Sequence, residues 1–277
     1  MLLAVLQGIS ELFPISSLGH TVLIPALLRW KVDRSDPTFL AFVVALHFGT
    51  ALALIAFYRN AWVQIVRALA GSIARGRLSD EPQEKLGWLL VVGTVPVALL
   101  GVFLEKPVRQ FFGSSALVAV FLILNGFVMF AGEALRRRDL ASTSPTRPLT
   151  SLSWSDGSRI GFAQAAALLP GISRSGASIV AGLLLRLNHE DAARYSFLLA
   201  TPVIFAASVL ELPQLFRSSG DVLAQAGVGA LLAGLTAYAS VVFLTRWFSA
   251  HDLRPFGWYC LVFGTLCLAL ALAKVIT

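Results

Sequence analysis

A polar break inside an apolar sequence, residues 7–20 (QGISELFPISSLGH), limits most strongly how this chain can fold. Apolar residues flank it at 1–6 and 21–28, and the break itself contains Pro14 and Gly19, which interrupt a continuous helix. A half-helix of about ten residues rises roughly 15 Å, half the thickness of the membrane hydrocarbon. Irregular backbone survives at that depth only where it lines a protein-walled or watery cavity. The break therefore predicts a re-entrant helical hairpin that carries a site.

The composition is that of a polytopic membrane protein. Of the 277 residues, 57% are hydrophobic and 13% are charged, and the mean hydropathy is +0.77. These values are too apolar for a soluble domain of this size, so we expect an all-α integral membrane protein. The formal net charge of +7 suggests nucleic acid at first sight, but basic loops that follow the positive-inside rule explain it better. We expect membrane lipids as partners and no nucleic acid.

Six apolar segments have the length of a membrane span. A basic and partly amphipathic stretch, residues 59–85, follows the first of them and predicts a helix at the membrane interface. The six predicted spans are 39–58, 86–104, 116–135, 196–210, 222–245 and 255–273.

The second half of the chain repeats the pattern of the first. A second polar break, residues 170–178 (PGISRSGAS), lies between apolar segments 160–169 and 179–185, and its ISRSG aligns with the ISSLG of the first break. Each half then has one re-entrant hairpin and three spans, and an odd number of crossings inverts the second half. The predicted units are a first repeat at 1–138, a Ser/Thr/Pro-rich cytoplasmic linker at 139–159 and an inverted repeat at 160–277.

The basic residues predict an orientation. If the long basic loop and the linker are cytoplasmic, 14 of the 22 Lys and Arg lie inside and seven lie outside, and Arg174 remains in the second break. The first hairpin then enters from the outer face and the second from the cytoplasmic face, so that their tips meet at mid-depth. We expect an active site that is open to the outer face.

Arg174 and the small residues around it have the composition of a phosphate cradle. A break that opens a helix leaves unpaired N–H groups, and the guanidinium of Arg174 binds phosphate with two parallel hydrogen bonds. The alternative is that Arg174 pairs with Glu11 and neutralises a buried charge, and both can hold in different ligation states. The candidate hydroxyl donors to the substrate are Ser16, Ser173, Ser175 and Ser178.

Glu11 is the only acid deep in an apolar segment, because Glu133 and Glu211 lie at the ends of predicted spans. A carboxylate beside a phosphate site is repelled unless it holds a divalent cation or acts as a base. Gln7, four residues earlier on the same helical face, offers a neutral oxygen ligand; the alternative is a hydrogen bond in helix packing.

Ser17 and His20 are three residues apart, which places them on one face of a helix beyond Pro14 and predicts a nucleophile and base pair. The other polar candidates have simpler interpretations. We interpret His47, Asn125 and Tyr238 as interhelical hydrogen-bonding residues, and His189 and His251 as solvated loop residues.

These motifs resemble the signatures of a known family. QGISELFPISSLGH is similar to (E/Q)xxxE followed by PxSSxGH, and LLPGISRSGAS is similar to PGxSRSxxT. Both are signatures of undecaprenyl-diphosphate phosphatases, the bacitracin-resistance type of bacterial plasma-membrane enzyme. The departures are Gln7 at the first acid position, Leu18 where Thr is usual, and Ser178 in place of Thr.

The resemblance implies metal-dependent removal of the terminal phosphate from undecaprenyl diphosphate, which recycles the lipid carrier of peptidoglycan synthesis and confers resistance to bacitracin. It implies that Glu11 is the metal-binding or basic carboxylate, that Ser17 and His20 are the catalytic pair, and that Arg174 with Ser173 clamps the diphosphate. The expected cofactor is a divalent cation, Mg²⁺ or Ca²⁺, at Glu11 and Gln7.

Two functions from different classes fit the sequence. The first is this phosphatase, in which Ser17, His20 or water is the nucleophile. The alternative is a polyprenyl-phosphate flippase or secondary transporter, because an inverted repeat with two broken segments is also a transport architecture. Glu11, Ser17 and His20 together favour catalysis, since a carrier needs a binding Arg but no nucleophile or base. The sequence does not specify an oligomeric state.

Overall fold

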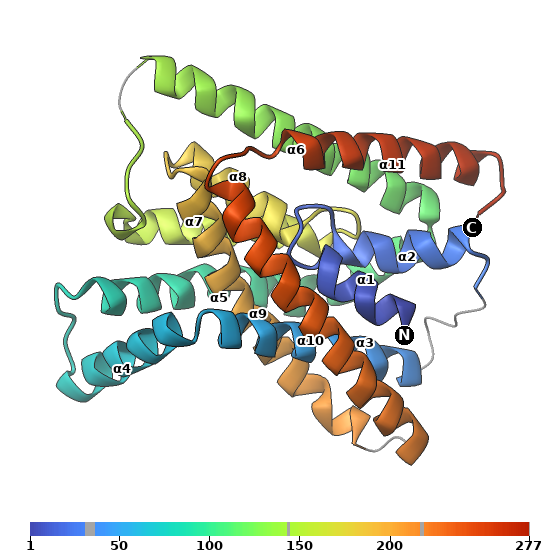
Figure 1. The fold of residues 1–277 in the computed structure, drawn as a ribbon, viewed down its shortest axis with the longest axis horizontal. Coiled ribbons are helices and arrows are strands. Elements are labelled where there is room, and N and C mark those ends of the chain that lie inside the picture. The colour runs from blue at the N-terminus through green and yellow to red at the C-terminus, as the bar shows by residue number, and fades with distance from the viewer. Residues whose placement is uncertain (31–36, 143–144, 217–218, 277) are drawn as a thin grey trace.

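The computed structural model describes residues 1–30, 37–142, 145–216 and 219–276, and in these ranges the chain is helical (Figure 1). The predicted all-α class is confirmed. Between the first predicted hairpin and the first predicted span, residues 31–36 lie outside the described residues. The α-helices are α1 (Leu2–Ser10), α2 (Ser17–Leu27), α3 (Pro37–Phe57), α4 (Arg59–Arg75), α5 (Pro82–Arg109), α6 (Ser115–Ser142), α7 (Trp154–Ala165), α8 (Arg174–Leu184), α9 (His189–Leu215), α10 (Gly220–Phe248) and α11 (Arg254–Leu272). Three 3-10 turns, η1 (Gln110–Gly113), η2 (Leu149–Ser151) and η3 (Ala166–Leu168), join some of them.

Five described helices are long and apolar enough to cross a membrane, and a sixth span is added if the bent pair of α3 and α4 counts as one. The five lie in α5, α6, α9, α10 and α11, where the sequence predicts the last five spans. The first predicted span, 39–58, corresponds to α3. The chain is therefore a multi-pass membrane protein.

Helix α4 begins immediately after α3 but runs at 88° to it. The sequence changes at this point from the charge-free α3 to a helix with Arg59, Arg67 and Arg75. Helix α4 lies beside α5 (Figure 1) and buries Ile65 and Ala68 on one face, as an amphipathic helix does. The predicted helix within 59–85 is confirmed, and it ends at Arg75.

Both polar breaks separate pairs of short helices that pack against each other, α1 with α2 and α7 with α8. The irregular backbone is narrower than the predicted breaks. In the first break it covers residues 11–16, so that Gln7 lies within α1; in the second, Arg174 is the first residue of α8.

The described parts of the segment predicted as a linker, 139–142 and 145–159, include helical residues at both ends. Helix α6 continues to Ser142, and α7 begins at Trp154, where Ser153 and Asp156 form a capping box. Between them, Arg147 donates hydrogen bonds to the Leu185 carbonyl oxygen at 2.6 Å and to Asp156 Oδ2 at 2.8 Å.

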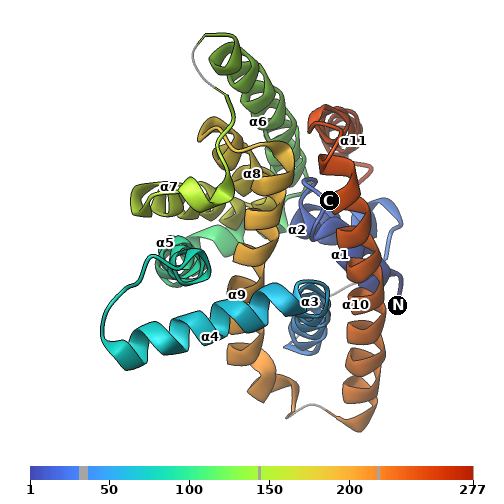
Figure 2. The same ribbon diagram turned by 60° about the vertical axis from the view of Figure 1, so that its left-hand side comes forward.

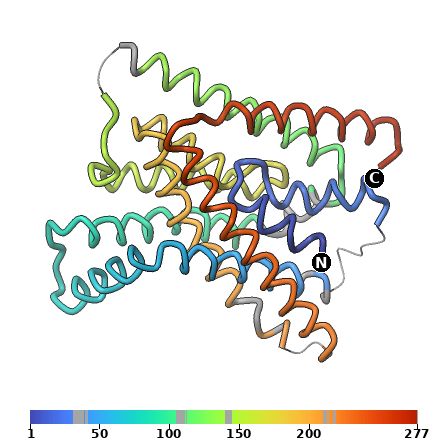
Figure 3. Tube along the Cα trace, in the orientation of Figure 1, coloured from blue at the N-terminus to red at the C-terminus, as the bar shows by residue number. Residues whose placement is uncertain are grey.

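Helices of the first half of the chain pack against helices of the second half. Helix α1 lies along α10 and α7 lies along α5, while α3 packs on α9 and α10 and α6 packs on α11 (Figure 2). Helix α9 lies at the centre of this packing, with Tyr195, Phe197 and Leu198 completely buried. The turn after α1 and the turn before α8 therefore meet inside the protein (Figure 3), where Gly171 and Ser16 are hydrogen bonded.

His189 is not a solvated loop residue, as the sequence suggested. It is the first residue of α9, and its Nε2 lies 2.6 Å from Oε1 of Glu133, a buried carboxylate on α6. The same oxygen accepts a hydrogen bond from the Leu253 amide at 3.1 Å. Glu133 thus joins α6, the start of α9 and the start of α11, because a buried carboxylate needs donors from its neighbours.

Glu133→Ala should lower the free energy of unfolding by about 2–3 kcal/mol, because it leaves the Leu253 amide and the imidazole of His189 without an acceptor. The measurement is thermal unfolding in detergent micelles, with Glu190→Ala as the control, since Glu190 is exposed at the same end of the molecule. Equal unfolding temperatures for the two variants would contradict this role of Glu133.

Candidate functional site

The two turns present the starts of α2 and α8 in the same way. Ser16 caps α2, and its Oγ accepts a hydrogen bond from the Gly19 amide at 3.2 Å. Ser173 caps α8, and its Oγ accepts from the Gly176 amide at 3.1 Å. Both are the N-cap interaction that serine favours. The sequence alignment of ISSLG with ISRSG therefore matches cap with cap, and it makes Ser17 the counterpart of Arg174.

Hydrogen bonds join the two turns directly. Ser16 Oγ also accepts from the Gly171 amide at 3.2 Å, and Ser175 Oγ donates to the Phe13 carbonyl oxygen at 3.1 Å. The amide of Asn125, on α6, bridges them, because its Nδ2 donates to the Pro14 carbonyl oxygen at 2.9 Å and its Oδ1 accepts from the Ser173 amide at 3.0 Å. These bonds fix the distance between the first break and the second.

Two residues in these turns have unusual backbone conformations. Ser16 has a φ of +69°, which costs about 1–3 kcal/mol for a residue other than glycine and persists only where the surroundings enforce it. Gly171 has a φ of +116°, and a Cβ there would collide with the Val118 carbonyl oxygen at 2.5 Å. Close packing against α6 thus requires glycine at position 171.

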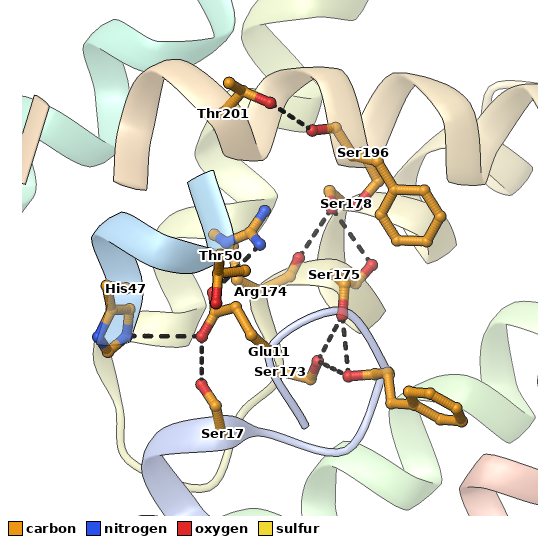
Figure 4. A network of polar contacts seen from close by, with 12 residues as sticks. Glu11, Ser17, His47, Thr50, Ser173, Arg174, Ser175, Ser178, Ser196 and Thr201 are labelled. Carbon is orange, nitrogen blue, oxygen red and sulfur yellow. Dashed lines mark hydrogen bonds and ion pairs between the residues drawn. The ribbon is translucent and has the colours of Figure 1, made fainter. Parts of the chain in front are cut away.

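A buried polar cluster surrounds the carboxylate of Glu11 (Figure 4). Oε2 accepts hydrogen bonds from Gln7 Nε2 at 2.9 Å and from Ser17 Oγ at 2.5 Å, and His47 Nε2 lies 3.5 Å away. Oε1 accepts from Arg174 NH2 at 3.3 Å. The donors come from α1, α2, α3 and α8, and we call these five residues the Glu11 cluster. The predicted pair of Glu11 and Arg174 is confirmed in this structure.

The guanidinium of Arg174 is only partly bonded. Its contact with Glu11 is long at 3.3 Å, and its buried NH1 has no hydrogen-bond partner. A guanidinium carries five N–H donors, and an unpaired buried donor costs about 1–3 kcal/mol. Arg174 therefore has donors to offer an anion beside Glu11.

Ser17 and His20 do not form the predicted nucleophile and base pair. Ser17 donates to Glu11, while His20 Nδ1 lies 2.7 Å from the Ser16 carbonyl oxygen and His20 Nε2 lies 2.7 Å from the Tyr259 hydroxyl. The His20 ring also stacks on Tyr259 and Phe263 of α11. Helical spacing predicted that Ser17 and His20 share a face. In the structure, His20 contacts Tyr259 and Phe263 of α11, whereas Ser17 contacts Glu11. The carboxylate that accepts from Ser17 is that of Glu11.

Most of the predicted substrate-binding hydroxyls hold the fold together. Ser16 and Ser173 are caps, and Ser175 joins the two turns. Ser178 Oγ contacts the Arg174 carbonyl oxygen at 2.8 Å and Ser196 Oγ at 2.7 Å, so it faces α9. Their hydroxyls are engaged in these bonds, and the Gly176 amide is engaged by the Ser173 cap, so the partly bonded guanidinium of Arg174 is the group here with a donor to offer an anion.

His47 and Asn125 are the residues whose importance the sequence interpretation missed. His47 contacts another helix, as predicted, but its partner there is the carboxylate of Glu11. Asn125 does bridge helices, as predicted, and two of its partners are the two turns themselves. The signal for His47 was available, because an ionisable residue in a charge-free span is a functional candidate by default.

The oxygen atoms near Glu11 fit one kind of cation site. Among the described residues, no group of three or more His, Cys, Asp or Glu side chains could hold a metal ion. The cluster offers one carboxylate, the Gln7 amide oxygen and the Ser17 hydroxyl. Such oxygen donors suit a hard divalent cation, Mg²⁺ or Ca²⁺, whose remaining ligands would come from water and substrate phosphate.

Comparison with known proteins gives one consistent result. The family model described as "Bacitracin resistance protein BacA" matches residues 1–266. The chain is 46% identical over 275 residues to "Undecaprenyl-diphosphatase 2" of Chromobacterium violaceum, covering 96% of this chain and 95% of that protein. It is 46% identical over 277 residues to "Undecaprenyl-diphosphatase" of Acidiphilium cryptum, covering 98% and 96%. It is 46% identical over 280 residues to "Undecaprenyl-diphosphatase" of Mycolicibacterium paratuberculosis, covering 93% and 92%.

Asn125→Leu should lower both stability and activity, because it leaves the Pro14 carbonyl and the Ser173 amide unpaired, at a cost of about 1–3 kcal/mol for each buried group. The measurements are the unfolding temperature in micelles and the activity of the purified protein. Thr201→Val is the matched control, since Thr201 is buried but donates only to the Phe197 carbonyl of its own helix. An Asn125→Leu variant as stable and active as this control would show that the bridge is dispensable.

Proposed function

Because this chain belongs to the BacA family of bacitracin resistance proteins, we propose that it hydrolyses undecaprenyl diphosphate to undecaprenyl phosphate and inorganic phosphate, with the Glu11 cluster as its active site. The observation that carries the proposal is the 2.5 Å hydrogen bond from Ser17 Oγ to Glu11 Oε2, beside a guanidinium with unpaired donors. A hydroxyl on a buried carboxylate is the arrangement of a nucleophile and its base.

The substrate head group is a diphosphate, and Arg174 is the residue that binds it. Its planar fork matches two phosphate oxygens, and the amides that open α8 add donors and a positive helix end. Arg174 exchanges its long contact with Glu11 for the phosphate. The polyprenyl chain lies among the spans, where apolar side chains replace lipid as its surroundings.

Ser17 attacks the terminal phosphorus in the first half of the reaction. Glu11 Oε2 accepts the Ser17 proton while a bond forms between Oγ and phosphorus and the bond from phosphorus to the bridging oxygen breaks. The bridging oxygen leaves with its electron pair as part of undecaprenyl phosphate, which takes the proton from Glu11. Charge on the transferring group is stabilised by Arg174, as in phosphoryl transfer generally.

Water completes the reaction in the second half. Glu11 accepts a proton from a water molecule whose oxygen attacks the phosphorus of the phosphoserine. Ser17 Oγ leaves and takes that proton back, and inorganic phosphate is released. The atoms balance as one water consumed per anhydride bond broken.

Glu11 and Gln7 would hold Mg²⁺ together with a substrate phosphate oxygen, and the ion would neutralise the charge of the diphosphate beside the carboxylate. Gln7 contributes a neutral oxygen where the family signature also allows an acid. The cluster therefore depends on the substrate's own oxygens to complete the set of ligands.

The architecture that supports this chemistry is an inverted repeat of two re-entrant hairpins, each followed by three spans. The four hairpin helices have 9 to 12 residues, so each rises about half the hydrocarbon thickness. The packing supports the repeat, because α1 lies on α10 as α7 lies on α5, and the counterparts α3 with α9 and α6 with α11 pair with each other. Ser16 and Ser173 are equivalent caps.

The site opens to the outer face of the bacterial plasma membrane in this proposal, which rests on the excess of basic residues in the loops assigned to the cytoplasm. Undecaprenyl diphosphate would then enter from the outer leaflet. Bacitracin resistance follows from removal of the diphosphate from the lipid carrier.

The orientation predicts opposite accessibility at the two ends of α5. A cysteine at Gly113, which is exposed with no atom near its added Cβ, should react with an impermeant thiol reagent on intact cells. A cysteine at Asp80, exposed before α5, should react only after the membrane is opened. Cys260 and Cys267 are completely buried, so the unmodified chain is the background control. The reverse labelling pattern would overturn the orientation.

Ser17→Ala should reduce phosphate release from undecaprenyl diphosphate by at least about 100-fold, because it removes the nucleophile. Ser240→Ala is the matched control, since Ser240 is also buried and its hydroxyl donates to the Thr236 carbonyl of its own helix, and its activity should stay within about threefold of the wild type. The assay uses purified protein in micelles with and without Mg²⁺.

Two results would contradict the assignment in different ways. Normal turnover by Ser17→Ala would show that another group attacks phosphorus. Exchange of lipid phosphate across a vesicle membrane by the wild type, with no release of inorganic phosphate, would favour the flippase instead of the enzyme.

A further inference from the structure

His47 is held in a fixed position on α3, facing the carboxylate of Glu11. Its Nδ1 lies 2.9 Å from the Val43 carbonyl oxygen, which fixes the ring against its own helix, and its Nε2 lies 3.5 Å from Glu11 Oε2. The carbonyl accepts, so Nδ1 carries a proton, and the contact of Nε2 with a carboxylate is attractive when Nε2 carries one as well. Figure 4 shows the ring beside Glu11, on the side opposite Arg174.

His47 lies on a helix outside the hairpin that carries Glu11. Helix α3 packs mainly on α9 and α10, whereas Glu11 follows α1 and Ser17 begins α2. The His47 side chain is 21% exposed and that of Glu11 is 7% exposed, so the contact lies at the edge of the cluster. A residue on a separate rigid helix can hold a turn in place while other groups in the cluster move.

Some donors to Glu11 change partners during the proposed reaction and others keep their contact with it. Arg174 turns to the phosphate, and Ser17 gives its proton to the carboxylate and becomes bonded to phosphorus. Gln7 and His47 take no part in either step. The carboxylate must nevertheless stay within reach of Ser17 through both halves of the reaction, because a general base acts only within hydrogen-bond distance.

We propose that His47 is a positioning residue that holds the Glu11 carboxylate in place once Arg174 has left it for the diphosphate. The inference rests on the proposed function and adds a role for a residue that acts on the reaction through Glu11 and does not itself bind the substrate. Side chains that orient an active-site or metal-binding carboxylate typically contribute about 10- to 100-fold to activity or cation affinity.

The test compares three substitutions on α3. His47→Leu removes the contact with Glu11, His47→Gln restores an N–H donor of similar reach, and Leu52→Ala is the control. Leu52 lies on the same helix, and its side chain is exposed on the outside of the protein. We expect His47→Leu to lower kcat by about 10- to 100-fold with KM changed less than about threefold. We expect His47→Gln to recover most of that loss and Leu52→Ala to match the wild type.

A second measurement needs no turnover. In EDTA, unfolding temperatures of His47→Leu, Glu11→Gln and the double variant form a double-mutant cycle. If His47 holds Glu11, the double variant should be destabilised by less than the sum of the two single changes. The Mg²⁺ concentration for half-maximal activity should also rise in His47→Leu and be close to the wild-type value in His47→Gln.

The outcomes separate this inference from the proposed function. A wild-type protein that releases no phosphate overturns the proposed function, while the cycle in EDTA still tests the contact. An active wild type with an unchanged kcat in His47→Leu, or with additive unfolding temperatures, overturns the positioning role. If His47→Leu fails to fold, His47→Gln is compared with His47→Asn, whose amide is too short to reach Glu11. Equal activities of these two variants would overturn the positioning role.

Discussion

A single buried carboxylate determines how the two halves of this protein meet. Glu11 is 8% exposed inside a membrane protein, where an unpaired charge costs at least a few kcal/mol. Donors from α1, α2, α3 and α8 compensate it, and α8 comes from the second half of the chain. Because breaking a buried ion pair leaves an uncompensated charge, the cluster is also a constraint on the fold: the second turn must bring Arg174 to the first. The site and the contact between the halves are therefore the same structure.

The polar residues of the two turns divide into a frame and a reactive set. Ser16, Ser173 and Asn125 satisfy backbone groups that would otherwise be buried without partners, and they make the turns rigid. Arg174 and Ser17 occupy equivalent first positions of α8 and α2, and both contact Glu11. A rigid frame suits the proposed reaction, in which the proton acceptor Glu11 stays within hydrogen-bond distance of Ser17 while the guanidinium of Arg174 changes partners. Arg174 has two possible partners, the carboxylate and a phosphate, and its unpaired NH1 shows that the first does not satisfy it.

The sequence predicted the features that follow from local chemistry. Pro14 and the small residues around Arg174 located both turns, hydropathy located the spans, and charge in an apolar setting identified Glu11 and Arg174 as a pair. It failed where side chains choose between partners that lie far apart in the chain. Helical spacing placed Ser17 and His20 on one face, but Tyr259, more than 200 residues away, binds His20. His189 and Glu133 looked like span-end residues because nothing local reveals that α6, α9 and α11 meet there. The predicted inverted repeat and the orientation in the membrane stay predictions.

The residue at position 7 sets the charge of the cluster. Gln7 Nε2 donates to Glu11 Oε2 at 2.9 Å, so an acid there would place two carboxylates within hydrogen-bond distance. Two carboxylates this close share one proton unless a cation compensates the charge of both. With glutamine, one carboxylate faces one guanidinium, and the cluster is compensated before any cation binds. A diphosphate that draws Arg174 away removes this compensation and leaves a carboxylate beside added negative charge. Cation affinity in this chain should therefore arise mainly when the substrate is present, because the substrate supplies both the missing oxygens and the need for positive charge.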